Sequence, residues 1–168
     1  MPVYVAVCGP DPASDDVLAL SEEVGRLLAR AGAVLICGGL GGTMEAAARG
    51  VSAEGGISIG ILPGSSRGEG NRYLSYSIPT GMGEMRNALL VRSADALITV
   101  AGEFGTLSEI AFALKTGVPV IGLGTWELSK AGRDVSDPIV RATTPKEAVA
   151  QALRLASDAI GSSGSGSG

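Results

Sequence analysis

The chain has 168 residues, of which 45% are hydrophobic and only 18% are charged, with a mean hydropathy of +0.32 and a formal net charge of −4. An acidic chain has no overall attraction for DNA, RNA or an anionic membrane surface, so any anionic ligand must be held by local groups. The sequence contains no histidine. This excludes a Ser-His-Asp triad, a histidine zinc site and imidazole acid–base catalysis.

The N-terminal residues MPVYVAV lack a basic segment ahead of their apolar run, and no apolar run approaches the roughly 18 residues of a transmembrane helix. We therefore expect a cytoplasmic protein with no membrane partner. Residues 1–160 suit one Rossmann-like domain, and residues 161–168, which are only Gly and Ser, are expected to form a flexible tail. Cys8 and Cys37 each end a predicted strand and are expected to be buried free thiols.

The first elements alternate between strand and helix patterns. Residues 3–9 form a short β-branched run that ends at Gly-Pro and predicts a buried strand. Ser14 is the expected N-cap of a helix whose apolar residues recur at helical spacing until Gly32 ends it. The next predicted elements are a strand at residues 33–37, a helix at 43–54 and a strand at 57–62.

The second half of the chain continues this alternation. After a polar loop and a short extended piece near YSIP, the predicted elements are a helix at about residues 84–94, a strand at 96–100, a helix at about 106–116, a strand at 118–123 and a helix at 145–157. Residues 126–137 lack periodicity and are expected to be loop. Apolar strands that alternate with single helices imply a mainly parallel sheet with helices on both faces. The predicted fold is a single doubly wound, Rossmann-like α/β domain.

Two glycine-rich segments each join a predicted strand end to a helix start. In parallel sheets ligands bind beyond the carboxyl ends of the strands, and a helix start offers unpaired N–H groups and a positive dipole end to an anion. Glycine lets the backbone approach a phosphate closely, although the same residues could serve only to make tight turns. Two such loops on one sheet edge favour a binding site. Its candidate residues are Gly38, Gly39, Gly41, Gly42 and Thr43 in the first loop, and Gly102, Gly105 and Thr106 in the second.

Neither loop matches a standard nucleotide motif. No Gly-Lys-Ser/Thr follows, so neither loop is a Walker A sequence, and neither has the spacing of the G-x-G-x-x-G dinucleotide fingerprint. No acidic residue stands at a second strand end to bind an adenosine ribose. ATP hydrolysis and NAD-dependent hydride transfer are therefore disfavoured, and a smaller phosphorylated ligand remains.

Four segments carry a family resemblance: GGLGGTMEAA, GISIGILPG, GEMRNALLVRSADALITVAGEFGTLSE and ALKTGVPVIGL. They resemble the LONELY GUY family and, at least as closely, its relatives the molybdenum cofactor carrier proteins. The wider superfamily includes DNA-processing protein A. The resemblance extends from about residue 3 to residue 123, and its most specific part combines an arginine on one helix with the later G-x-G-T-x-x-E type of sequence.

The resemblance to LONELY GUY enzymes implies a phosphoribohydrolase that needs no cofactor and cleaves a nucleoside 5'-monophosphate to free base and ribose 5-phosphate. It places phosphate binding on the second glycine loop and the catalytic pair on Arg86 and Glu109. A carboxylate can stabilise the oxocarbenium character of a breaking ribosyl bond, which suits Glu109, while Arg86 could clamp the phosphate or polarise the departing base. The alternative is that Arg86 and Glu109 form a structural ion pair.

Two departures favour the carrier branch, in which the ligand would be molybdenum cofactor or another pterin phosphate. Where the enzymes have Pro-Gly-Gly, this chain has Ala-Gly-Glu, so Glu103 adds a carboxylate, expected to point to solvent, beside the predicted anion site. The enzymes have Met-His-x-Arg-Lys, where this chain has MGEMRN at residues 82–87 and so lacks the His and the Lys. Met82 and Asn87 of this segment are expected to border the ligand. Because both catalytic positions are intact, we place the hydrolase first and the non-catalytic carrier second.

Other residues are weaker candidates. Glu45 is expected mainly to complement a helix dipole, and Phe104 would either stack on a base or cover the sheet edge. Arg67, Asn71 and Arg72 are expected to lie in a solvated loop. The helix at 84–94 has apolar residues on more than one face, which predicts a homodimer or a larger homo-oligomer. DNA binding is the least expected function of an acidic chain.

Overall fold

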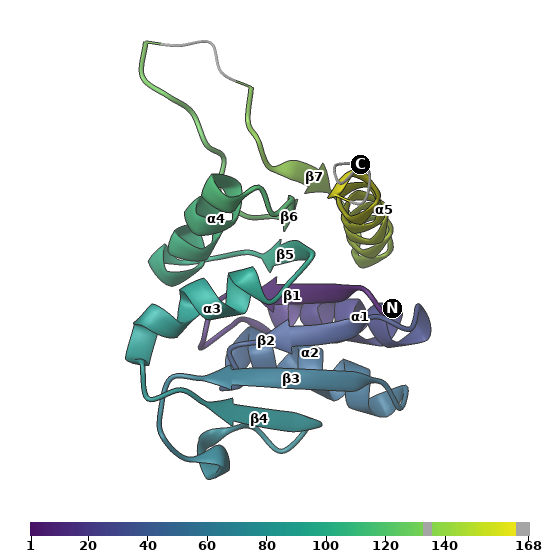
Figure 1. Ribbon diagram of the computed structural model, residues 1–168, viewed down its shortest axis with the longest axis vertical. Helices are drawn as coiled ribbons and strands as arrows, with labels where there is room; N and C mark the ends of the chain where they lie inside the picture. Colours follow the sequence, from purple (N-terminus) through teal and green to yellow (C-terminus); the bar gives the residue numbers. More distant parts are fainter. Residues whose placement is uncertain (133–135, 164–168) are drawn as a thin grey trace.

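The computed structural model describes residues 1–132 and 136–163, and within these residues seven parallel strands form one sheet. Across the sheet the order is β4-β3-β2-β1-β5-β6-β7 (Figure 1). The strands are β1 (Tyr4–Cys8), β2 (Val34–Cys37), β3 (Ile57–Leu62), β4 (Tyr76–Pro79), β5 (Ala96–Val100), β6 (Val120–Leu123) and β7 (Val140–Ala142). The prediction of a doubly wound parallel sheet is confirmed.

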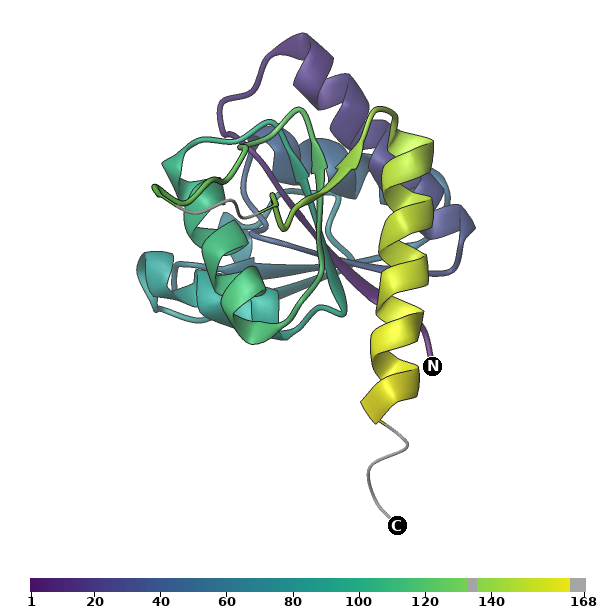
Figure 2. The same ribbon diagram turned by 90° about the horizontal axis from the view of Figure 1, so that it is seen from above.

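Helices cover both faces of this sheet. The helices are α1 (Asp15–Arg30), α2 (Gly42–Ala53), α3 (Asn87–Arg92), α4 (Phe104–Thr116) and α5 (Pro145–Ser163), with two short 3₁₀ helices, η1 (Arg67–Glu69) and η2 (Gly83–Arg86). Buried residues of α1, α2 and α5 pack on one face, and those of α3 and α4 pack on the other. Seen from above, α1 and α5 lie on one side of the strands and α4 on the opposite side (Figure 2).

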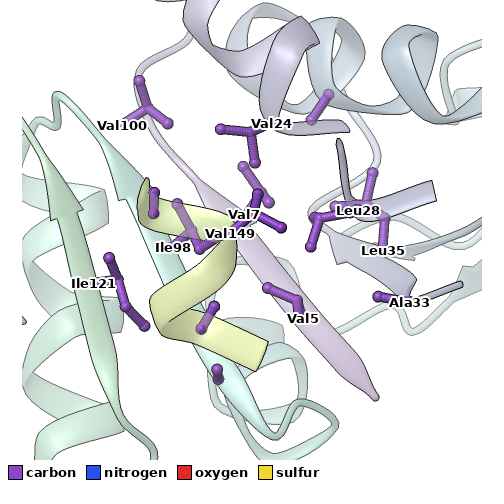
Figure 3. Packing of buried hydrophobic residues seen from close by; sticks show 14 of the residues in the cluster. Val5, Val7, Val24, Leu28, Ala33, Leu35, Ile98, Val100, Ile121 and Val149 are labelled. Carbon is purple, nitrogen blue, oxygen red and sulfur yellow. The ribbon is translucent and has the colours of Figure 1, made fainter. Parts of the chain in front are cut away.

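The core follows from the two-residue period of the strands. In β1, Val5 and Val7 pack with α1, α2 and α5, whereas Ala6 and Cys8 belong to the cluster under α3 and α4. Figure 3 shows Val5 and Val7 on the face that also carries Val24 of α1. Because both faces are covered, a strand can be apolar at every position, which explains why the strands are such clear features of the sequence.

Two glycines let α1 and α2 approach each other at backbone distance. A Cβ atom at Gly25 would lie 2.1 Å from the carbonyl oxygen of Ala47, and one at Gly50 would lie 2.0 Å from the carbonyl oxygen of Glu22. Any larger residue at these positions would force the helices apart. This contact holds α2 in place, with its start at the carboxyl edge of the sheet.

Most predicted elements occur where the sequence places them. Ser14 is the N-cap of α1, and its hydroxyl accepts the N–H of Val17 at 3.4 Å, while Cys8 and Cys37 are buried free thiols, as expected. The strand β7 was not predicted, because three residues are too few to show a period. The last helix extends to Ser163 rather than 157, into the predicted Gly/Ser tail, and the remainder of that tail lies outside the described residues.

Two helix starts near the carboxyl edge also differ from the predictions. The helix α4 begins at Phe104 rather than near Thr106, so Gly105 and Thr106 lie in its first turn. Both residues are therefore among those whose N–H groups have no intrahelical partner. The predicted helix at 84–94 is divided into η2 and the shorter α3. None of the described helices is both long enough and apolar enough to cross a membrane.

Candidate functional site

The strand order has a switch point between β1 and β5. From β1 the chain passes to β2, β3 and β4 on one side, and it then returns to place β5 on the other side. The loops after β1 and β5 therefore diverge and leave a crevice, which is where doubly wound sheets bind ligands.

Two cavities that share lining residues open at this switch point. The smaller cavity, of about 260 Å³, is lined by Gly9, Pro10, Asp11, Met44, Arg86, Asn87, Glu103, Gly105, Thr106 and Glu109. The larger cavity, of about 550 Å³, shares Asp11, Met44, Arg86, Asn87 and Gly105 and extends over Leu40, Pro63, Glu84, Phe104 and Ser108. Residues from both halves of the sheet thus meet at one site.

Arg86, the last residue of η2, lies between these cavities with 8% of its surface exposed. Its Nη2 donates to the carbonyl oxygen of Gly38 at 3.3 Å, and its Nη1 donates to Oδ1 of Asn87. The buried Nε has no hydrogen-bond partner, and no carboxylate among the described residues forms a salt bridge with this guanidinium. A buried cation without a counter-ion is costly, so the site favours an anion.

The contact with Arg86 also fixes how Asn87 presents its amide. A guanidinium can only donate hydrogen bonds, so the amide oxygen of Asn87 must face it. The NH2 group of Asn87 is then left as a donor at a position that lines both cavities. Arg86 and Asn87 therefore act together as a donor pair.

The first turn of α4 supplies further donors. Glu103 is the N-cap, and the first intrahelical bond runs from the N–H of Leu107 to the carbonyl of Glu103 at 3.0 Å. The N–H groups of Phe104, Gly105 and Thr106 thus precede the first intrahelical bond. They point out of the N-terminal end of α4, where helices bind anions.

Gly102 and Gly105, the two glycines at the start of α4, contribute to the site in different ways. Gly102 has φ = +140°, and a Cβ atom there would lie 2.9 Å from Cγ2 of Thr106, so only glycine makes the turn. The preceding Ala101 also has a positive φ, of +52°. At Gly105, in contrast, a Cβ atom would meet nothing within 4 Å. Gly102 therefore shapes the backbone, whereas Gly105 leaves the first turn open to a ligand.

Glu109 lies one turn further along α4, lines the smaller cavity and is 8% exposed. Burial raises the pKa of its carboxyl group, and this effect is opposed by a hydrogen bond from the Cys8 thiol and by the charge of Arg86. Burial and the neighbouring Glu109 likewise raise the pKa of Cys8 well above its usual range. Arg86 and Glu109 form no salt bridge in the described part of the chain, so the hypothesis of a structural ion pair between them is wrong.

Glu103 is exposed, as expected, and its side chain does not cap α4. Its backbone carbonyl accepts a hydrogen bond from Nε1 of Trp126 at 3.3 Å. Its carboxylate therefore adds negative charge at the rim of the smaller cavity without occupying the helix start.

The groups of the first glycine loop contact the protein itself. The carbonyl oxygens of Gly38 and Gly39 accept hydrogen bonds from Arg86 and Asn71, respectively, and the Thr43 hydroxyl donates to the carbonyl of Pro10 at 3.0 Å. The loop thus positions Arg86 and the segment after β1. A ligand-binding role for its glycines stays a prediction.

Asp11 is a residue of the site that the sequence analysis did not identify. Its carboxylate oxygens lie 3.1 Å from the position of a Cβ atom on Gly41, next to the start of α2, and Asp11 lines both cavities. Asp11 follows β1 in the segment GPDP, so the rule that placed the glycine loops at strand ends could have identified it. The start of α2 therefore already has an acidic neighbour, and the start of α4 is the more accessible anion site.

The other predicted residues lie outside these two cavities. Met82 is 42% exposed and does not line either cavity, while Gly42 and Glu45 line a separate cavity of about 260 Å³ beside Arg49. Arg67 is exposed in η1, Asn71 holds the first glycine loop, and Arg72 donates to the hydroxyl of Tyr73 at 3.0 Å. Among the described residues, no cluster of three or more His, Cys, Asp or Glu side chains could hold a metal ion.

Comparison with known proteins agrees with this picture. The model of the SLOG cluster4 family matches residues 2–149. An uncharacterized protein of Archaeoglobus fulgidus is 44% identical over 121 residues, which cover 72% of this chain and 80% of that protein. The match to the family model extends over both glycine loops and the segment that carries Arg86 and Glu109.

Solved structures of similar fold include carriers of molybdenum cofactor. The molybdenum cofactor binding protein of Rippkaea orientalis has a TM-score of 0.82 and 32% identity, over 95% of this chain and 98% of that one. The molybdenum cofactor carrier protein of Chlamydomonas reinhardtii has a TM-score of 0.80 and 30% identity, over 92% of this chain and 99% of that one. DNA processing protein A of Helicobacter pylori, at 18% identity and a TM-score of 0.68 over 91% of this chain and 81% of that one, shares the fold.

Proposed function

This chain belongs to the SLOG cluster4 family, and we propose that it is a non-catalytic carrier of a phosphorylated heterocycle, with molybdenum cofactor or another pterin phosphate as its cargo. The sequence analysis placed this function second, after a phosphoribohydrolase. The burial of Glu109 and the exposed carboxylate of Glu103 support placing the carrier first.

One observation carries the proposal: the buried guanidinium of Arg86 and the open first turn of α4 face the same pair of cavities. The Nε of Arg86 has no hydrogen-bond partner, and among the described residues no carboxylate forms a salt bridge with its guanidinium. Gly105 leaves the N–H groups of the helix start accessible. A phosphate monoester carries one to two negative charges and several acceptor oxygens, so it matches both groups at once.

The larger cavity also suits the rest of such a ligand. Its volume of about 550 Å³ lies within the range of small-molecule sites, and its wall combines apolar Leu40, Met44 and Pro63 with the aromatic ring of Phe104. The polar donors are concentrated near Arg86 and α4. This arrangement is the one expected for a flat ring attached to a phosphate.

The similarity to two molybdenum cofactor binding proteins at 30% identity or more, over nearly the whole chain, supports the identity of the cargo. The cavities hold no cluster of metal-ligating side chains in the described part of the chain. In our proposal the protein therefore contacts the pterin and the phosphate, and the metal travels as part of the cargo.

A phosphoribohydrolase is the second candidate, and the position of Glu109 beside Arg86 in the smaller cavity favours it. A carboxyl group whose pKa is raised by burial could donate a proton to a departing base. The burial of Glu109 leaves little of it accessible to a ribose, however, and the carboxylate of Glu103 adds negative charge near the phosphate. Both features favour binding without turnover.

The test compares binding and turnover in the full chain. The protein is titrated with 6-hydroxymethylpterin monophosphate, GMP and AMP, while melting temperature, calorimetric Kd and free base are measured. We expect thermal stabilisation by the phosphorylated pterin without release of free base. Free base that forms with wild type but not with Glu109→Gln would establish the hydrolase instead.

Arginine variants supply the matched control. Arg86→Gln removes the buried guanidinium and should weaken binding at least tenfold, because a charge-assisted contact to phosphate contributes roughly 1.5–3 kcal/mol. Arg92→Gln removes an exposed arginine at the end of α3, outside both cavities, and should leave Kd unchanged. If no phosphorylated compound raises the melting temperature of wild type, the proposed function is wrong.

A further inference from the structure

Phe104 is a large apolar side chain that stands exposed at the rim of the larger cavity. It is 77% exposed even though it begins a helix beside a buried core. Its ring lines the same cavity as Arg86, and its own N–H group belongs to the open first turn of α4. An aromatic surface therefore adjoins the groups that attract phosphate.

A second aromatic residue supports this ring. The ring centroids of Phe104 and Trp126 lie 5.6 Å apart, with an angle of 41° between the ring planes. Trp126 is fixed at two points, since its Nε1 donates to the carbonyl of Glu103 and its own carbonyl accepts Nη2 of Arg141 at 2.6 Å. The residues that directly follow β6 are thereby attached to the start of α4 (Figure 1).

We propose that Phe104 stacks on the aromatic ring of the ligand, with Trp126 as the positioning residue that holds Phe104 in place. This inference rests on the proposed function and narrows its ligand class: the site takes a phosphate that is attached to an aromatic heterocycle, either a pterin or a purine, and discriminates against a sugar phosphate alone. Stacking on an exposed aromatic side chain typically changes affinity by about tenfold, and it depends on the flat face of the ring rather than on its substituents.

The chain contains a single tryptophan, Trp126, so its fluorescence reports on this aromatic pair directly. The probes are GMP, 6-hydroxymethylpterin monophosphate, ribose 5-phosphate and inorganic phosphate. We expect the two heterocyclic phosphates to bind at least tenfold more tightly than ribose 5-phosphate by calorimetry. We also expect GMP, which does not absorb at the emission wavelength, to change the emission of Trp126, whereas ribose 5-phosphate does not.

Variants separate stacking from general stability. Phe104→Leu should bring the affinities for GMP and ribose 5-phosphate to within about threefold of each other while the Kd of ribose 5-phosphate stays the same. Trp126→Leu removes the ring that contacts Phe104 and should lose part of the preference for GMP. Trp126→Phe keeps an aromatic ring at this position and should retain most of that preference. A role of Trp126 in folding alone would leave the preference unchanged in both variants. Size-exclusion chromatography with light scattering checks that each variant keeps the mass of wild type.

Each outcome decides the inference. If Phe104→Leu leaves the GMP preference intact while binding still depends on Arg86, the stacking role is wrong and the proposed function survives. If the preference is lost together with a change in oligomeric mass, Phe104 belongs to an interface and the inference is also wrong. If wild type binds none of the four probes, the inference and the proposed function both fall.

Discussion

Arg86 Nη2 donates to the carbonyl oxygen of Gly38 at 3.3 Å, across 48 positions of sequence. This contact gives the first glycine loop a purpose other than phosphate binding, because the loop after β2 holds the guanidinium at the switch point. The candidate ligand site therefore involves both glycine loops, one through Arg86 and the other through its own backbone donors.

The first prediction concerns Gly38→Ala. A Cβ atom there would lie 2.5 Å from Nη2 of Arg86 and 2.6 Å from Sδ of Met44, and both are flexible side-chain ends that can move. We expect the fold to lose only about 1 kcal/mol, while the Kd for a phosphorylated pterin rises about tenfold because the guanidinium is displaced. Urea unfolding and calorimetry measure the two effects. Unchanged affinity would show that the position of Arg86 is unimportant for binding.

Gly105→Ala should separate stability from binding. The new methyl group meets no protein atom within 4 Å, and alanine favours a helix over glycine by up to about 1 kcal/mol, so the melting temperature should stay the same or rise. The methyl group would cover the open first turn, however, and phosphate affinity should fall about tenfold. Gly161→Ala in α5 is the matched control, since that glycine also has open surroundings and lies outside both cavities. Equal Kd values for Gly105→Ala and wild type would contradict the placement of the ligand on this turn.

Glu109→Gln should change how stability depends on pH. Because the pKa of Glu109 is raised in the folded protein, the native state binds the proton more tightly than the unfolded chain does. The stabilisation that Glu109 contributes through this proton is therefore fully present below the pKa of the unfolded chain, near 4.3. It is lost as the pH rises through the pKa of Glu109 in the folded protein. Glutamine does not titrate, so Glu109→Gln does not lose this stabilisation at high pH. The melting temperature of the variant minus that of wild type should therefore be larger at pH 8 than at pH 4. A difference that does not vary with pH would mean that burial does not perturb this carboxyl group.

Exposed apolar residues just before η2, within η2 and within α3 predict self-association. Met82, Met85 and Leu89 are 42%, 75% and 42% exposed and recur at helical spacing, which fits the homodimer implied by the family resemblance. Met85→Glu should place a charge in this contact and shift the protein to monomer at micromolar concentration by light scattering. Arg92→Glu, an exposed change at the end of α3, should not alter the mass. A monomeric wild type would refute the expected dimer.

The contact between α1 and α2 gives a prediction about the fold alone. Gly50→Ala would bring a methyl group to 2.0 Å from the backbone carbonyl of Glu22, which cannot move aside as a side chain can. We expect a loss of roughly 3 kcal/mol or more in urea unfolding, because the helices must separate. The same glycine-to-alanine change at Gly161 has open surroundings and should be harmless. A small loss at Gly50 would mean that the two helices can shift without cost.

The sequence alone predicted most of the secondary structure, because the relevant patterns are local. A strand that is covered on both faces is apolar throughout, and a helix with one covered face shows its period within four residues, so β3 and β5 have the predicted limits. The helix starts were less accurate, because a helix can begin without a side-chain cap, as α4 does at Phe104. The short edge strand β7 had no readable pattern.

The candidate site was predicted in its residue types more than in its arrangement. Arg86, Gly105, Thr106 and Glu109 do meet at the smaller cavity, although Gly102 lines neither of the two cavities. Two features were not predicted. Gly38 accepts a hydrogen bond that holds Arg86, and Asp11 lies beside the start of α2 and lines both cavities. Both depend on residues that are far apart in sequence: pairing of β1 with β2 brings Asp11 to Gly41, and the fold brings Arg86 of η2 to Gly38, which follows β2.

By itself, then, the amino-acid sequence determined most of the order of strands and helices, the lack of histidine chemistry and the location of the candidate ligand groups at strand ends, since each of these follows from composition or local spacing. The tertiary structure decided which of those groups remain available. Hydrogen bonds across 30 to 50 residues engage the first glycine loop, and the turn at Gly102 leaves the start of α4 open. The buried Nε of Arg86 keeps no hydrogen-bond partner in the described part of the chain. These features are set by the three-dimensional packing of distant segments, which no local pattern encodes.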